Sequence, residues 1–417
     1  MKSSVRLLLH LIALVVLLFH ASSFGSAQES GNLTSVPDVH FTSGKSARRI
    51  PFTIAANHIF IQVLVNNSAP SWFVLDSGAG DSVVDKRKAM ALKLKLIRED
   101  EGSGIGEKTV EAGLVKGLSL RLPGVELLGQ TLYAAPLDSL EPAAGRPVGG
   151  LLGYDFFNRF VVEIDYTALV INLYDPVSYR YSGSGESIPI TLERNHAFAR
   201  ASIVSSKGSI IEGKFLIDTG GARVVDLTAP FVEMHKLLDG DQRTIQGFVA
   251  GIGGQINLRI GRLQSLQLGH YVVKAPVVGF SQSAKGASAS SEMDGIIGGD
   301  LLSRFKVILD YSRKRMILEL NSHFARSDKY DMSGMRLISG DSKFKTFKVQ
   351  RIIENSPAID AGLREGDVIF KIDGSPAAKL TLERTRQMFK QAGRSYVLSV
   401  KRGDEVIQTK IKLRRLI

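Results

Sequence analysis

One short pattern occurs twice in the chain, and each copy joins an apolar strand to an acidic turn. Residues 73–79 read Phe-Val-Leu-Asp-Ser-Gly-Ala, and residues 215–221 read Phe-Leu-Ile-Asp-Thr-Gly-Gly. An aspartate at the end of a buried strand requires either hydrogen bonds to its charged form or a chemical role. If the two turns met face to face, Asp76 and Asp218 would form a pair of carboxylates.

The repetition extends well beyond these turns. The other matched blocks are, in chain order, Ile-Pro-x-Thr at 50–53 and 188–191, Asn-His at 57–58 and 195–196, two apolar residues before a glycine at 151–153 and 296–298, and Asp-Tyr at 165–166 and 310–311. Matched blocks in the same order indicate a duplicated unit of roughly 140 residues, which is much longer than a solenoid repeat. The sequence therefore predicts two homologous lobes.

The repeated unit resembles one lobe of an aspartic protease of the pepsin and retroviral-protease clan. The resemblance rests on the apolar strand that ends in Asp-Ser/Thr-Gly, the Gly-rich segment after it and the apolar-apolar-Gly strand. It implies a mainly β fold with two homologous aspartic-protease-like β-barrel lobes. We expect lobe one at 48–174 and lobe two at 187–320, joined by a linker at 175–186.

The same resemblance implies roles for individual residues. Asp76 and Asp218 would be catalytic, sharing one proton and activating a water, because two close carboxylates cannot both ionise readily. Their neighbours would lock the two loops together and allow close approach, and these residues are Ser77, Gly78, Thr219 and Gly220.

A glycine cluster lies between each acidic turn and its apolar-apolar-Gly strand. Glycine allows a hairpin to fold over substrate and open again. The candidate flap residues are Gly102, Gly104, Gly106, Gly251, Gly253 and Gly254. The alternative interpretation is two ordinary Gly-rich hairpins.

The C-terminal part, residues 333–417, resembles an α+β PDZ domain of the bacterial type. The resemblance rests on Ser-Pro-Ala at 356–358, Ala-Gly-Leu at 361–363, Gly-Asp at 366–367 and Asp-Gly at 373–374, with a helix expected at 381–393. PDZ modules bind a peptide as an added strand, and a loop of backbone N–H groups holds its terminal carboxylate. By position that loop contains Gly334, Met335, Arg336 and Leu337, with Arg336 in place of the second glycine common in the motif.

The N-terminal residues have the pattern of a secretory signal. Residues 1–27 combine a basic start, an apolar run and small residues at the end, which predicts an exported protein, periplasmic or secreted. The alternative is an uncleaved signal that anchors the chain in the membrane. Residues 28–47 are largely polar and predict a mobile lead-in.

Composition narrows the possible chemistry. The chain of 417 residues contains no cysteine, which excludes disulfides, thiolate metal sites and a cysteine nucleophile. The histidines outside the signal lack the spacing of a metal site and no G-x-S-x-G motif is present, so we expect neither metal nor cofactor. The net charge of +12 suits an anionic envelope surface or acidic peptides, and the alternative is a solvated basic face. Nucleic-acid binding is not expected without a recognisable module.

We therefore predict an exported aspartic endopeptidase that acts on peptide or protein substrates, with a PDZ domain that binds peptides or protein substrates. The alternative is a non-hydrolytic peptide-binding or scaffold protein built on the same groove. Ala79 and Gly221, three places after each aspartate, offer no hydroxyl to stabilise the charged carboxylate. This absence predicts a mildly acidic or neutral pH optimum.

Overall fold

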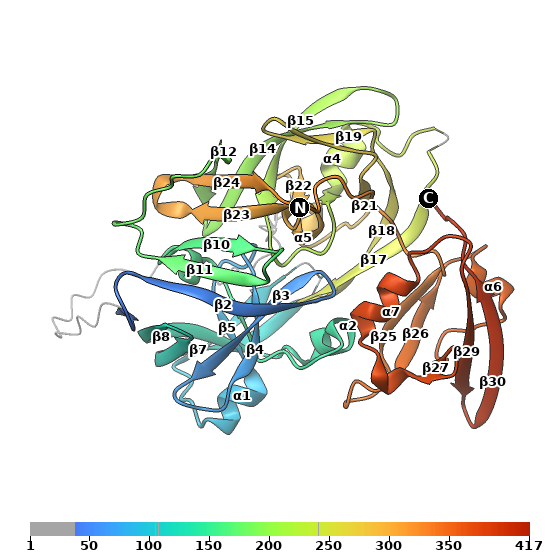
Figure 1. Cartoon of the computed structure of the whole chain (residues 1–417), viewed down its shortest axis with the longest axis horizontal. Helices are drawn as coiled ribbons and strands as arrows, with labels where there is room; N and C mark the ends of the chain where they lie inside the picture. Colours follow the sequence, from blue (N-terminus) through green and yellow to red (C-terminus); the bar gives the residue numbers. More distant parts are fainter. Residues whose placement is uncertain (1–37, 105, 107, 241) are drawn as a thin grey trace, which may run out of the picture.

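The described part of the chain is built from β-sheets. The structure, a computed structural model, describes residues 38–104, 106, 108–240 and 242–417. Its strands form three sheets, which confirms the prediction of a mainly β fold. The predicted signal peptide and residues 28–37 of the predicted lead-in lie outside the described residues. Figure 1 shows the two lobes together, with the C-terminal domain (residues 333–417) packed beside them.

Lobe one consists of strands with a few short helices between them. Its elements are β1 (Val39–Phe41), β2 (Ser46–Ala55), β3 (His58–Val65), β4 (Ser71–Leu75), β5 (Val83–Asp85), α1 (Lys86–Ala91), β6 (Arg98–Ser103), β7 (Thr109–Leu122), β8 (Val125–Ala135), η1 (Asp138–Leu140), α2 (Glu141–Ala144), β9 (Gly150–Leu152), α3 (Tyr154–Phe157), β10 (Val161–Asp165) and β11 (Val170–Tyr174). The burial of β3 alternates over much of its length, as expected for a strand with one face in the core.

Lobe two repeats the order of these elements. It contains β12 (Glu186–Pro189), β13 (Thr191–Glu193), β14 (His196–Val204), β15 (Ile210–Ile217), β16 (Val225–Leu227), α4 (Ala229–Met234), β17 (Ile245–Gly251), β18 (Gly254–Arg262), β19 (Ser265–Leu268), β20 (Tyr271–Lys274), β21 (Val277–Ser281), η2 (Ala287–Ala289), β22 (Gly295–Ile297), α5 (Gly299–Leu302), β23 (Phe305–Asp310), η3 (Tyr311–Arg313) and β24 (Arg315–Leu320). In both lobes the strand before the acidic turn pairs in parallel with the apolar-apolar-Gly strand, β4 with β9 and β15 with β22. The topology thus carries the same duplication as the sequence.

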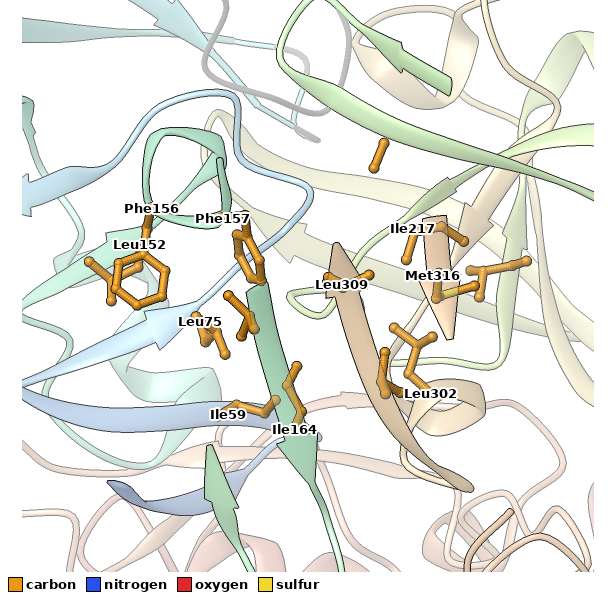
Figure 2. Close-up of a cluster of buried hydrophobic side chains, with 14 of the residues drawn as sticks. Ile59, Leu75, Leu152, Phe156, Phe157, Ile164, Ile217, Leu302, Leu309 and Met316 are labelled. Atoms are coloured by element: carbon orange, nitrogen blue, oxygen red, sulfur yellow. The ribbon is translucent and has the colours of Figure 1, made fainter. Parts of the chain in front are cut away.

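A shared sheet joins the two lobes. Its strands lie in the order β12-β24-β23-β10-β11-β2, and the seam between the lobes is the antiparallel pair β10–β23, with Val162 opposite Leu309. Figure 2 shows the core near this seam, where Leu75 and Ile217, the last residues of β4 and β15, lie among apolar side chains. The residues before each aspartate are therefore anchored in one continuous core.

The predicted lead-in ends earlier than expected. Residues 39–41 form β1, which pairs with β8, and β2 already begins at Ser46. The ring of Phe41 packs edge-on against Phe160, with 5.9 Å between ring centroids. Backbone pairing and burial of this ring offset the entropy cost of ordering the segment. The prediction of a mobile lead-in is therefore wrong from residue 39 onward.

The C-terminal domain has its own sheet and core. Its elements are β25 (Met335–Ser339), β26 (Phe347–Ile352), α6 (Pro357–Asp360), β27 (Val368–Ile372), β28 (Ser375–Pro376), η4 (Ala377–Lys379), α7 (Leu382–Met388), β29 (Ser395–Arg402) and β30 (Glu405–Lys412). Helix α7 is shorter than the predicted 381–393: Thr381 caps its start, and the chain turns at Gly393, whose φ is +78°. Strand β25 lies at the edge of the sheet, between α7 and helix α2 of lobe one (Figure 1).

Among the described residues, no helix has both the length and the apolar character needed to cross a membrane.

Candidate active site

The two acidic turns are held by the strands that run beside them. The N–H of Asp76 donates to the carbonyl of Leu152 at 2.9 Å, and the N–H of Asp218 donates to the carbonyl of Ile297 at 2.9 Å. Both acceptors lie in the apolar-apolar-Gly strands, β9 and β22. These strands therefore fix the backbone of each turn at the residue that carries the carboxylate.

A reciprocal set of hydrogen bonds joins the two turns through Ser77 and Thr219. The N–H of Ser77 donates to Oγ1 of Thr219 and the N–H of Thr219 donates to Oγ of Ser77, both at 3.0 Å. Each hydroxyl also donates to a carbonyl of the opposite lobe at 2.7 Å, Ser77 to Ile217 and Thr219 to Leu75. Both side chains are fully buried, so these bonds are shielded from competing water.

The glycine of each turn lies against the carboxylate of the other turn. A Cβ atom on Gly78 would lie 2.5 Å from Cγ of Asp218, and one on Gly220 would collide with Asp76. Any larger residue would push the turns apart. The absence of side chains at Gly78 and Gly220 therefore lets Asp76 and Asp218 approach each other closely enough to hydrogen-bond.

Burial raises the pKa of both carboxyls. The pKa of Asp218 lies well above its usual range because of burial and the charge of Asp76. The pKa of Asp76 is raised by burial too, although its hydrogen bond to Asp218 and the N–H groups of Gly78 and Ala79 oppose the rise. Two such groups share one proton, and Asp218 is the side on which that proton is favoured.

The dyad lies in a cavity of about 680 Å³ that both lobes and the C-terminal domain line. Two hairpins, β6–β7 and β17–β18, meet over it. The N–H of Gly106 donates to the carbonyl of Ile252 at 2.9 Å, and that of Lys108 donates to Gly253 at 3.0 Å. Of the predicted flap residues, Gly102 lies farther back, within β6. The others lie at or beside this meeting point: Gly104, Gly106, Gly251, Gly253 and Gly254.

A turn of lobe one that the sequence analysis did not assign to the site lines the cavity. Ala56 and Asn57 both adopt positive φ between β2 and β3, a conformation that suits asparagine. Nδ2 of Asn57 donates to the carbonyl of Ala222 at 2.8 Å, just beyond the lobe-two acidic turn. Burial lowers the pKa of the adjacent His58 to about 4, and its ring hydrogen-bonds the backbone of Gly220. The repeated Asn-His pair at 57–58 and 195–196 was the sequence feature that could have assigned this turn to the site.

The predicted carboxylate-binding loop of the C-terminal domain already holds a carboxylate of its own chain. Oδ1 of Asp331 accepts from the N–H groups of Ser333 and Gly334 at 2.9 and 3.0 Å. The N–H of Met335 donates to Oγ of Ser333 at 3.0 Å. Gly334 has a φ of +77° and no room for a Cβ, and Met335 and Leu337 are buried in the domain core. Within the predicted loop, the backbone donors of Gly334 and Met335 are therefore engaged.

Helix α7 attaches the C-terminal domain to lobe one. Oε2 of Glu383 accepts from the N–H of Ala56 at 2.9 Å. Nη2 of Arg386 donates to the carbonyl of Ala143 in α2 at 2.9 Å and to that of Leu337 in β25 at 2.8 Å. No sequence pattern predicts these contacts, because each depends on where a separate domain docks.

No three His, Asp or Glu side chains in the described part of the chain converge in a way that could hold a metal ion.

Paired acidic turns, their reciprocal hydroxyl contacts and a buried carboxyl dyad define the class of the aspartic proteases. Comparison with known families agrees: residues 61–156 match the model of the aspartyl protease family, and residues 329–413 match that of the PDZ domain. The chain thus carries a retropepsin-like aspartyl protease domain and a C-terminal PDZ domain, as the sequence predicts. The protease match lies within lobe one. No curated protein matches the chain at a significant level.

Proposed function

We propose that the protein is an aspartic endopeptidase that hydrolyses peptide bonds with the Asp76–Asp218 dyad. The observation that supports this most is the pair of hydrogen-bonded carboxyls with raised pKa values at the floor of a large cavity. Two carboxylic groups that share a proton supply a base and an acid at the same place. The cavity volume of about 680 Å³ lies within the usual range of ligand-binding sites.

In the proposed reaction, the ionised carboxylate takes a proton from a water as the water oxygen attacks the scissile carbonyl carbon. The protonated carboxyl, favoured on Asp218, donates its proton to the carbonyl oxygen, which gives a tetrahedral diol. The diol then collapses: the C–N bond breaks, one hydroxyl proton returns to the dyad, and the amine nitrogen receives a proton as it leaves. The burial of the dyad keeps the two carboxyls from ionising together.

The test is incubation of the purified protein with a random peptide library, with Asp76→Asn and Asp218→Asn as matched controls. Cleavage by the native protein alone supports the proposal. Binding of peptides without cleavage by any of the three proteins would favour the non-hydrolytic alternative.

We also propose that the protein is exported, on the basis of the signal pattern at 1–27. N-terminal sequencing of the protein from an envelope fraction tests this. A mature chain that begins near residue 28 supports cleavage, and retention of Met1 in a membrane fraction would favour the anchored alternative.

A further inference from the structure

Arg336, the residue that departs from the PDZ motif, leaves its own domain. Its neighbours Met335 and Leu337 are buried in the core of the C-terminal domain, so the arginine side chain points the other way from the edge strand. Its Nη1 donates to the carbonyl of Phe248 at 2.8 Å, and its guanidinium stacks over the Phe248 ring at 4.3 Å. Phe248 belongs to β17, in the lobe-two flap hairpin. Arg336 therefore forms part of the wall of the catalytic cavity.

Four arginines line the cavity, and three of them have a carboxylate nearby, Arg351 through its ion pair with Glu365. Arg223 pairs with Asp226 through both carboxylate oxygens. Arg386 is close enough to Glu383 and Asp331 for their charges to favour its protonated form. Arg336 has no ion pair among the described residues, and its Nη1 donates to a neutral carbonyl.

These surroundings disfavour the charged form of Arg336. Burial and the charges of Arg386 and Arg223 lower the pKa of its guanidinium to about 10. A partly buried guanidinium that faces two others and lacks a carboxylate is electrostatically unfavourable until an anion joins it. At any pH in which the dyad works, Arg336 still carries its charge.

The backbone donors beside Arg336 are not free to bind that anion. The N–H groups of Ser333, Gly334 and Met335 donate to Asp331 and to the Ser333 hydroxyl. A peptide carboxylate that approaches this end of β25 thus meets the guanidinium of Arg336 beside three N–H groups that already have acceptors. A guanidinium binds a carboxylate with two parallel hydrogen bonds, which gives both strength and orientation.

We propose that Arg336 is a carboxylate-recognition subsite of the catalytic cavity, which selects peptides that carry a carboxylate at a fixed distance from the scissile bond. The carboxylate is that of an acidic side chain or of the peptide C-terminus. This inference rests on the proposed peptidase function and names its substrate class. It also assigns the C-terminal domain a direct share in substrate choice, because β25 supplies the residue.

The experiment compares the cleavage of matched peptides by the native protein and three variants. One peptide set replaces Gln by Glu at each position in turn, and a second set differs only in a free or amidated C-terminus. The variants are Arg336→Gln, Arg336→Lys and Arg351→Gln. Arg351 is the matched control, because it lies opposite Arg336 in the β25–β26 pair and lines the same cavity but already pairs with Glu365 at 2.8 Å.

We expect the native protein to prefer a carboxylate at one position by about 10- to 100-fold in kcat/KM, the range of a charge-assisted hydrogen-bonded pair. Arg336→Gln should remove this preference, Arg336→Lys should retain part of it, and Arg351→Gln should leave it unchanged. Preference in the Glu set identifies a side chain as the carboxylate, and preference in the free-terminus set identifies the C-terminus. Equal cleavage of all peptides by the native protein, or an undiminished preference in Arg336→Gln, would overturn the inference.

A binding measurement separates this inference from the proposed reaction. The same peptides are titrated into Asp218→Asn protein, with and without Arg336→Gln, by calorimetry. Carboxylate-dependent binding that needs Arg336, in a native protein that cleaves nothing, would overturn the peptidase proposal and keep the subsite. Cleavage without any carboxylate dependence would overturn the subsite and keep the peptidase proposal. Thermal unfolding of each variant shows whether loss of the Phe248 contact disturbs the fold.

Discussion

The two lobes are alike at the acidic turns and differ in what surrounds those turns. Each turn is braced by a parallel apolar strand and joined to the other through a hydroxyl. The Asn57 turn of lobe one reaches across to lobe two, whereas the matching turn of lobe two places Arg194 against Glu292 of the same lobe. Within the site, symmetry is thus limited to the acidic turns and the strands and hydroxyls that hold them. The walls of the cavity are asymmetric, and the C-terminal domain contacts lobe one through α7 and lobe two through Arg336.

The largest expected effect tests whether the lobes are equal at the reacting groups. Asp76→Asn and Asp218→Asn should each reduce kcat/KM by at least about 1,000-fold, because a dyad that shares one proton fails when either member cannot ionise. Peptide cleavage and thermal unfolding of both variants check this. Activity within tenfold of native in either variant would show that the lobes do not contribute equally.

The second prediction concerns the loss of stability in acid that the buried histidines His58 and His196 cause. Burial lowers the pKa of His196 from 6.5 to about 4, so the unfolded chain binds a proton that the folded chain excludes between these two values. Stability should fall by on the order of 3 kcal/mol from pH 7 to pH 4 on account of His196 alone. Urea unfolding of His196→Phe across that range should show a correspondingly flatter profile. His58, which is partly exposed to the cavity, should give a smaller effect, and an unchanged slope in His196→Phe would contradict the assignment.

The third prediction tests the reciprocal bonds between the turns. Thr219→Val keeps the shape of the side chain but removes both of its hydrogen bonds, and Ser77→Ala does the same in lobe one. Each should lower the free energy of unfolding by about 2 kcal/mol, because buried partners are left unsatisfied. The double variant should cost less than the sum, because the loss of either pair of bonds already loosens the turn that the other pair holds. Additive losses, measured by denaturant unfolding, would show that the two hydroxyls do not act as one unit.

The smallest expected effect concerns the pH profile. The N–H of Ala79 favours the charged form of Asp76, but no side-chain hydroxyl adds to it. Ala79→Ser should supply that donor, lower the pKa of Asp76 and move the acid limb of the pH–rate profile down by about half a unit. Lobe one is the better place for this test, because a Cβ on Gly221 would lie 3.2 Å from both Asp218 Oδ2 and Gly298 Cα. An unchanged or alkaline-shifted limb would count against the argument.

The sequence predicts those parts of the molecule that are determined by short local patterns or by the internal repeat. The acidic turns, the bracing strands and the C-terminal domain each have a short pattern whose physical demand is specific, such as a glycine where a carboxylate lies against the backbone. Strand β1 was missed because its pairing with β8 depends on a distant partner and on the burial of Phe41.

The asymmetric walls of the cavity were beyond sequence reasoning for the same reason. The contacts of Glu383 with Ala56, and of Arg336 with Phe248, join residues that are far apart in the chain and belong to different domains. Nothing in the composition around them distinguishes these charges from a solvated surface. The exception is Arg336, where the departure from a motif marked the position before its contacts were known.

The backbone bonds between the two flap tips have a consequence for the kinetics of the molecule. They close a ring of protein around the cavity, in addition to the junction that Ser77 and Thr219 provide. In the proposed reaction, a polypeptide enters either end-first through the closed ring or after the flap hairpins separate. Separation breaks these amide–carbonyl bonds before the reaction begins. Such gating occurs on the microsecond to millisecond scale and often limits turnover. For the proposed peptidase, an extended segment passes such an opening more readily than a compact domain, so the unfolding of a target would matter along with its sequence.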